Sequence, residues 1–123
     1  MADPVAWYGA GPEAMGRDNY EDFFTAIQDP STVRGMLEDY RAGLAVDRLH
    51  DEADRAQGRT LQCPLLCLWS ERDDLPELYG DVLGVWLAWA PDRRGHAIAS
   101  GHHMAEEAPT EVAFALSQFF APS

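Results

Sequence analysis

The sequence predicts an α/β fold in which a helical segment precedes a β-α-β-α unit with an incomplete parallel sheet. Before about residue 58, apolar side chains recur at helical spacing. After it, two short apolar runs without helical periodicity are each followed by a helical pattern. The 123 residues hold too few elements to cover both faces and both edges of such a sheet. The chain therefore reads as part of a larger domain.

Three helices are expected in the first half. The first opens at Pro12 and continues toward Ile27 through aromatic residues at helical spacing. Asp29-Pro30-Ser31 ends it, and Ser31 is expected to cap a second helix that ends near Gly43. A third, mostly charged helix is expected over residues 46–57, with Gly58 as its stop. The apolar stripe of the second helix consists of Val33, Met36, Leu37 and Tyr40.

The second half carries the strands. Leu61 to Trp69 is expected to form a buried strand of the parallel type, and Leu78 to Trp89 a helix rich in large apolar groups. Gly95 to Ser100 is expected to be a second strand, and Pro109 to Phe120 a final helix. This order is typical of a β-α-β-α unit.

Composition limits the kinds of partner. The formal net charge is -12, and all nine basic residues are arginines. Such a balance repels phosphate backbones, so neither nucleic acid nor an anionic membrane surface is expected as a partner. No run approaches the roughly 18 apolar residues that a membrane span needs, and the first residues lack the pattern of a signal peptide. A soluble cytoplasmic protein is expected.

The two cysteines lie in the segment Cys63-Pro64-Leu65-Leu66-Cys67. On an extended strand their Cα atoms would stand about 13 Å apart, which is too far for a disulfide. No second cysteine pair completes a zinc site. Both are expected to be buried free thiols.

The most informative stretch runs from Ser100 to Pro109. His102 follows Gly101 at the expected carboxyl end of a strand, where ligands bind in open α/β sheets and an imidazole can exchange protons near neutral pH. The glycine would let the backbone turn sharply. A histidine in a surface turn is an equally good interpretation of position alone. No metal site with His103 is expected, and Glu106 and Glu107 are most simply first-turn helix acids.

Several segments in order resemble one enzyme family, from about Pro12 to Phe120. The segments are Met36-Leu37-Glu38-Asp39-Tyr40-Arg41-Ala42-Gly43, Asp47, His50-Asp51, Asp54-Arg55, Gly58-Arg59, Cys63-Pro64-Leu65, Leu68-Trp69, Tyr79-Gly80-Asp81-Val82-Leu83, Trp86, and Gly101-His102 with Glu106-Glu107-Ala108-Pro109. Together they look like the C-terminal portion of the haloacetate and fluoroacetate dehalogenases, which are α/β-hydrolases. The resemblance implies a helical cap-domain remnant over residues 1–58 and the C-terminal β-α-β-α part of the hydrolase core over residues 59–123.

The resemblance also implies roles for individual residues. In that family an aspartate displaces halide and forms an ester, and a histidine activates the water that hydrolyses it. His102 resembles that histidine, and Tyr40 resembles the cap tyrosine that holds the departing halide. Trp7 resembles a pocket-lining aromatic residue, although core packing is favoured for it. The substrate would be a short haloacid, and no cofactor is expected.

The nucleophile is not found in these 123 residues. Nothing resembles Gly-x-Ser-x-Gly or its aspartate-bearing counterpart, and in this family the histidine-orienting acid also lies upstream. Asp73, just past the first strand, could orient His102 as in many other α/β-hydrolases, but a helix N-cap or surface turn is favoured. Ser70 replaces the glycine usual after Trp69. The alternatives are an ester or epoxide hydrolase and a non-catalytic remnant, with a homodimer or the missing N-terminal half as the expected partner.

Overall fold

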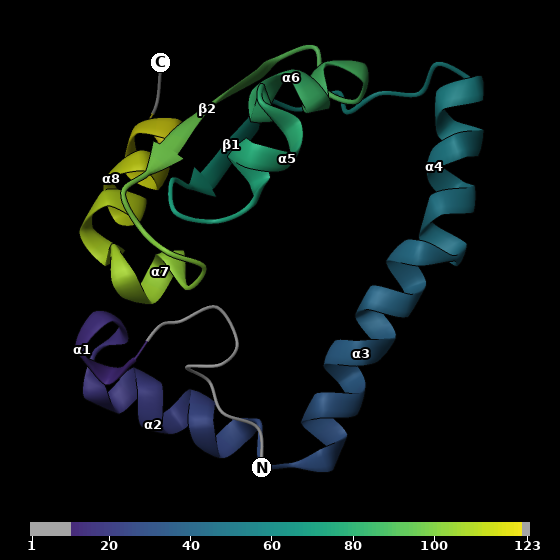
Figure 1. Ribbon diagram of the computed structural model, residues 1–123. Helices are drawn as coiled ribbons and strands as arrows, with labels where there is room; N and C mark the ends of the chain where they lie inside the picture. The colour runs from purple at the N-terminus through teal and green to yellow at the C-terminus, as the bar shows by residue number, and fades with distance from the viewer. Residues whose placement is uncertain (1–10, 122–123) are drawn as a thin grey trace.

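The computed structural model describes residues 11–121 (Figure 1). Helices α3 and α4 run one after the other along one side of the molecule, whereas α1 lies beside α7 and packs against α2 (Figure 1). The two strands, with α5, α6 and α8 around them, form the remaining part. No helix in the described part of the chain is long and apolar enough to cross a membrane.

The first expected helix is divided by a glycine. Helix α1 spans Pro12–Met15 and α2 spans Arg17–Ala26. Gly16 lies between them with a φ of 79°, a left-handed conformation that favours glycine and interrupts the helical backbone. Met15 is buried with 2% of its surface exposed, and α1 packs against α7. This contact joins the start of the described chain to its C-terminal third.

Helices α3 (Pro30–Leu44) and α4 (Val46–Ala56) confirm the second and third expected helices. The expected cap at Ser31 is wrong, because Asp29 occupies that position and its carboxylate accepts hydrogen bonds from the Ser31 amide at 2.8 Å and the Ser31 hydroxyl at 2.9 Å. A carboxylate can accept both donors and also carries the charge that a helix N-terminus favours. Neither helix has a buried residue.

The two strands pair in parallel, as the sequence predicts. Strand β1 spans Leu65–Ser70 and β2 spans Arg93–Ile98, with Cys67 opposite Gly95. β1 begins later than the expected Leu61, directly after Pro64, which has no amide hydrogen to donate to the ladder. β2 begins and ends two residues earlier than expected.

Helices cover the two faces of this sheet. Arg93 donates through Nε to the carbonyl oxygen of Leu83, which is in α6, at 3.0 Å. Its neighbour Arg94 places its guanidinium 4.8 Å from the ring centre of Phe119, which is in α8. Because consecutive strand residues point to opposite faces, α6 and α8 lie on opposite faces of the sheet.

The continuous helix expected over Leu78 to Trp89 is wrong. The structure has three short pieces there, α5 (Leu75–Tyr79), α6 (Val82–Val85) and the 3-10 helix η2 (Trp86–Ala88). Gly80 has a φ of 66°, which ends α5, and Asp81 restarts the helix by accepting a hydrogen bond from the Gly84 amide at 2.8 Å. Local chain-breaking residues thus override the apolar pattern.

The final helices follow β2 closely. Helix α7 spans Met104–Glu107, and α8 spans Pro109–Phe120, which confirms the expected last helix. Pro109 stands in the first turn of α8, where its missing amide hydrogen costs nothing.

The apolar core is small. The buried hydrophobic residues among those described are Met15, Ile27, Val82, Ala90, Ile98, Ala108 and Ala115. The accessible surface is 8816 Å², whereas a compact monomer of this mass would expose roughly 6,600 Å². Large apolar side chains such as Leu44, Phe114 and Phe120 are exposed. The excess surface agrees with a sheet whose neighbouring elements are absent.

The cysteines are free thiols, as expected, but the expectation that both are buried is wrong. Cys63 is exposed because it lies before β1, and Cys67 is half-buried within the strand. Partial burial raises the pKa of the Cys67 thiol, although a hydrogen bond involving Trp86 acts in the opposite direction.

Candidate active site

The two loops that follow the strands meet at one edge of the sheet. Strand β1 ends at Ser70 and β2 at Ile98, and these two residues are opposite each other in the parallel register. The amide of Glu71 donates to the carbonyl oxygen of Ile98 at 2.9 Å, and that of Arg72 to Ser100 at 3.2 Å. The loops thus continue the pairing beyond the strands and bring Asp73 and His102 together.

His102 and Asp73 form a close pair. Nδ1 of His102 lies 2.8 Å from Oδ2 of Asp73, with the two side chains 38% and 13% exposed. The other carboxylate oxygen accepts a hydrogen bond from the Asp74 amide at 2.9 Å. Asp73 is in the turn after β1, but it is not the N-cap of α5, because that position is held by Asp74. The N-cap interpretation of Asp73 is therefore wrong.

The charge state of Asp73 follows from these contacts. Burial of the carboxyl group opposes its ionisation, but the hydrogen bonds from Asp74 and His102 and the attraction of the imidazolium outweigh it and lower the pKa of Asp73. Asp73 is therefore ionised at neutral pH and can only accept hydrogen bonds. The proton in the contact accordingly belongs to Nδ1 of His102.

Tyr40 lines the same pocket as His102. The pocket has a volume of about 400 Å³, and its lining comes from α2, α3 and the segment around α7. Its residues are Phe23, Met36, Tyr40, His102, His103, Met104, Ala105 and Glu106. The structure thus brings together two residues 62 positions apart in the sequence (102 minus 40). Trp7, the remaining candidate, lies outside the described residues.

His103 forms the wall of this pocket next to His102. Its ring lies edge-on to Phe23, with 4.9 Å between ring centres, and perpendicular to the His102 ring at 5.5 Å. Its Nε2 atom is buried without a hydrogen-bond partner among the described residues. Within residues 11–121 no group of three His, Cys, Asp or Glu side chains could hold a metal ion.

Glu107 and Arg72 also belong to the site, and the sequence did not single them out for it. The Glu107 carboxylate, 7% exposed, accepts hydrogen bonds from the amides of Gly101 at 2.7 Å and His103 at 3.2 Å. Arg72 lies 3.4 Å from it. First-turn helix acids are common, so nothing in the local pattern distinguished Glu107 from Glu106.

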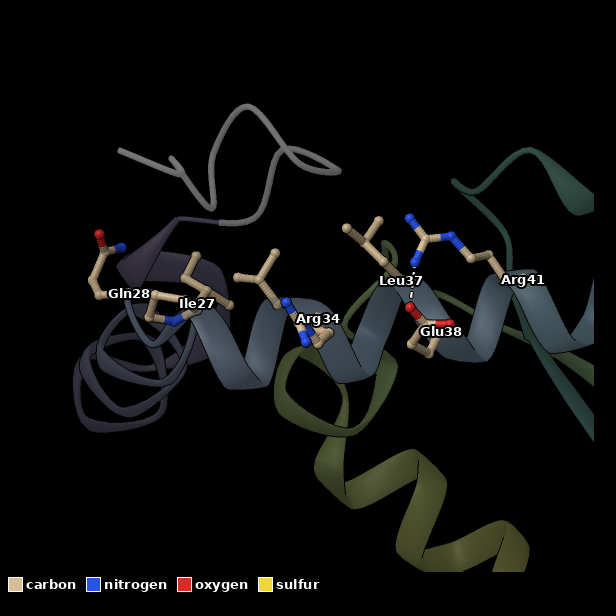
Figure 2. Close-up of a pocket in the computed structure, with 8 residues that line it drawn as sticks. Ile27, Gln28, Arg34, Leu37, Glu38 and Arg41 are labelled. Carbon is tan, nitrogen blue, oxygen red and sulfur yellow. Dashed lines mark hydrogen bonds and ion pairs between the residues drawn. The ribbon is translucent and has the colours of Figure 1, made fainter.

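A second pocket lies against α3 at the end of α2, and neither His102 nor Asp73 lines it (Figure 2). It is larger, about 540 Å³, and Figure 2 shows Arg41 directed at Glu38, with which it forms an ion pair. Its other lining residues are Ile27, Gln28, Pro30, Val33, Arg34 and Leu37. Its carboxylate, Glu38, is paired with Arg41, and no histidine lines the pocket, so volume alone does not make it the active site.

No family model matches the chain, but several solved structures are similar to it. Among solved structures, a candidate α/β-hydrolase from Nostoc sp. PCC 7120 is similar with a TM-score of 0.83 and 30% identity over 98% of this chain. A candidate epoxide hydrolase from Pseudomonas aeruginosa is similar with a TM-score of 0.78 and 36% identity over 96% of this chain. A mutant of that protein has a structure with bound MFA.

A candidate acyltransferase from Salmonella enterica is also similar, with a TM-score of 0.78 and 27% identity over 95% of this chain. This chain spans only 40% of the Nostoc and Salmonella proteins and 41% of the Pseudomonas protein.

Proposed function

We propose that this chain supplies the water-activating histidine of a hydrolase. The chain has the fold of the C-terminal part of an α/β-hydrolase, as the sequence predicted. The proposed reaction is hydrolytic dehalogenation of a short haloacid such as haloacetate. The nucleophilic aspartate would come from outside these 123 residues. The observation that supports this most directly is the 2.8 Å contact between His102 and Asp73 at the edge of a pocket that also contains Tyr40.

The chemistry follows from the state of the pair. Asp73 holds the proton of His102 on Nδ1, so Nε2 carries the lone pair that can accept a proton. In the proposed second half-reaction, water attacks the carbonyl carbon of an aspartyl ester and passes a proton to Nε2 of His102. The acyl C–O bond of the ester then breaks, and the leaving alkoxide takes the proton from Nε2 to depart as the hydroxyl group of a hydroxy acid. The carboxylic acid left on the nucleophile loses its proton to solvent and is again a carboxylate. Asp73 stabilises the imidazolium that forms.

Tyr40 is proposed to act in the first half-reaction. Its hydroxyl group is a hydrogen-bond donor suited to an anion, and the residue is exposed and lines the pocket that it shares with His102. When the nucleophile attacks carbon, the halide takes the electron pair of the breaking bond. A donor at that position would stabilise the departing charge.

The domain organisation remains a proposal as well. Residues 1–58 would be a helical cap remnant and residues 59–123 the C-terminal part of the core. The pocket lies where both parts contribute, since Phe23, Met36 and Tyr40 come from the first and His102 from the second. The same proposal includes a haloacid substrate and location in the cytoplasm. It also includes a partner, which is either a second copy of this chain or the N-terminal half.

The second candidate is another α/β-hydrolase activity, such as ester or epoxide hydrolysis. The similar Pseudomonas protein is described as a candidate epoxide hydrolase, and a histidine paired with a carboxylate serves ester cleavage equally well. The nucleophile separates dehalogenation from ester cleavage, because an aspartate followed by arginines would favour dehalogenation, whereas a serine would favour ester cleavage. A non-catalytic remnant is the alternative outside enzymes.

A chimera tests the proposal. This chain would replace the matching C-terminal part of the Pseudomonas relative, and halide release from fluoroacetate and chloroacetate would be measured beside ester and epoxide hydrolysis. The substitution His102→Ala should lower turnover by about 10³-fold or more, and mass spectrometry should detect a substrate ester accumulating on the nucleophile. The same change at the exposed His50 is the control. Halide release that is independent of His102 would refute the proposal, and ester or epoxide turnover alone would favour the second candidate.

A further inference from the structure

The backbone on both sides of His102 is held by one carboxylate. Oε2 of Glu107 accepts a hydrogen bond from the Gly101 amide at 2.7 Å, and Oε1 accepts one from the His103 amide at 3.2 Å. The Glu107 side chain is only 7% exposed, so water hardly competes for these oxygens. The two amides flank the residue whose imidazole contacts Asp73, so the carboxylate fixes the loop from which that imidazole projects.

Gly101 is the residue that lets this carboxylate approach. A Cβ atom at position 101 would lie 2.8 and 2.9 Å from the two carboxylate oxygens of Glu107, which is closer than real contacts allow. Gly101 has no positive φ, unlike Gly16, Gly58 and Gly80. A left-handed backbone is therefore not what requires a glycine at this position, although the chain does bend at His102, directly after it. The requirement comes from the space that the Glu107 carboxylate occupies.

Arg72 connects the same carboxylate to the other loop. Its Nη2 lies 3.4 Å from Oε2 of Glu107, and its Nη1 donates to the carbonyl oxygen of Ala99 at 3.2 Å. A buried carboxylate is costly unless it is paired, and Arg72 supplies the opposite charge. Arg72 directly precedes Asp73, so the contact with Glu107 and the contact with His102 start from adjacent residues of the first loop. The two loops are thus linked twice.

We propose that Glu107 is a positioning residue that holds the His102 loop so that Nδ1 faces Asp73, with Gly101 and Arg72 as its supports. This inference rests on the proposed function for its catalytic meaning, but the positioning itself is independent of any reaction. Glu107 acts through the amides of Gly101 and His103 and does not touch the imidazole.

The test uses two readouts on the full chain that require no turnover. Hydrogen–deuterium exchange with residue-level resolution measures the Gly101 and His103 amides, and ¹⁵N NMR of labelled histidine reports the tautomer of His102. In Glu107→Ala, exchange at both amides should rise at least about tenfold. The His102 ring should also lose its preference for the Nδ1–H tautomer. Amides in α8 and β1 should not change.

Three further variants separate the causes. Gly101→Ala should reproduce the effects of Glu107→Ala, because it displaces the carboxylate, and it should add little in the double variant. Asp73→Ala should change the tautomer but leave both amides protected. Glu111→Ala, an exposed acid in the first turn of α8, is the control and should change neither readout. If Glu107→Ala fails to fold, Glu107→Gln replaces it in the test. This variant keeps the side-chain volume and one acceptor oxygen, so it should lose protection at only one of the two amides.

Three results would each overturn the inference. The first is unchanged exchange at Gly101 and His103 when the carboxylate is removed. The second is faster exchange at these amides with an unchanged His102 tautomer, which would make Glu107 a loop support without influence on the imidazole. Equal loss of protection throughout α8 and β1 in every Glu107 variant would likewise assign it to general stability. A chimera insensitive to His102 would refute the proposed function while leaving these readouts intact.

Discussion

Nδ1 of His102 lies 2.8 Å from Oδ2 of Asp73, although the two residues are 29 positions apart in the chain. The distance is short because each residue follows a strand, and the strands run parallel, so their carboxyl ends meet at one edge. Neither residue needs a long side chain to reach the other. The parallel pairing of β1 and β2 is thus the physical origin of the candidate site.

Acid should weaken the fold through Asp73. Its pKa in the folded chain is lowered from the ordinary 3.8, so its contribution to stability is complete above that value and is lost as pH falls through the lowered pKa. The variant Asp73→Asn should lack this part of the acid dependence. Circular dichroism between about pH 6 and pH 2 measures it, with the exposed Asp51→Asn as the control. Identical acid transitions in the wild type and Asp73→Asn would contradict the expectation.

The start of α3 should depend on Asp29 more than on Ser31. Asp29→Ala removes the acceptor for both the amide and the hydroxyl of Ser31, whereas Ser31→Ala leaves the amide bond in place. The same two hydrogen bonds lower the pKa of Asp29. Exchange of the first amides of α3 and the thermal midpoint should therefore change more in Asp29→Ala. A larger effect of Ser31→Ala would restore Ser31 as the cap.

Strand pairing should not tolerate a side chain at Gly95. A Cβ atom there would lie 1.9 Å from the carbonyl oxygen of Cys67, its partner in the register, and a backbone atom cannot move aside. Gly95→Ala should lower the free energy of unfolding by about 1–3 kcal/mol. Gly43→Ala, in a helix with open space around it, should instead stabilise by about 0.5–1 kcal/mol. Urea unfolding of both variants measures the difference, and a neutral Gly95→Ala would argue against this register.

The isolated chain should expose an apolar surface that promotes self-association. Its accessible surface of 8816 Å² exceeds by about a third the roughly 6,600 Å² of a compact monomer of this mass. We expect the purified chain to bind a hydrophobic dye, dimerise or aggregate. Light scattering and dye fluorescence check this. A compact monomer without dye binding would mean that the apolar surface is covered in solution.

The purified 123-residue chain should show no dehalogenase turnover. It holds a histidine and a carboxylate but no recognisable nucleophile, so no covalent ester forms for His102 to resolve. Halide release from haloacetates, with and without the His102→Ala substitution, measures this. Release above background that disappears in the variant would place a nucleophile within the chain. The DNA upstream of the Met1 codon is an independent check, since an in-frame aspartate elbow there would supply the missing group.

Local patterns in the sequence determined the elements that depend on nearby residues. Periodicity, together with proline and glycine signals, predicted three of the helices. These are α3 with its apolar stripe, the charged α4, and the final helix from Pro109 to Phe120. The parallel pair was predicted from apolar runs. The helix expected over residues 78–89 failed because Gly80 adopts a positive φ and Asp81 caps a new turn, so two local signals outweighed a long apolar pattern.

Only the tertiary structure decided what the site residues contact. The sequence alone predicted site roles for His102 and Tyr40, through motif and resemblance, and left Asp73 between three interpretations. Its proximity to His102 depends on the register of two strands, which no local pattern specifies. Glu107 was indistinguishable from an ordinary first-turn acid until the fold brought its carboxylate to Gly101 and His103. Periodicity records neighbours along the chain, whereas an active site is built from groups that only folding brings within hydrogen-bond distance.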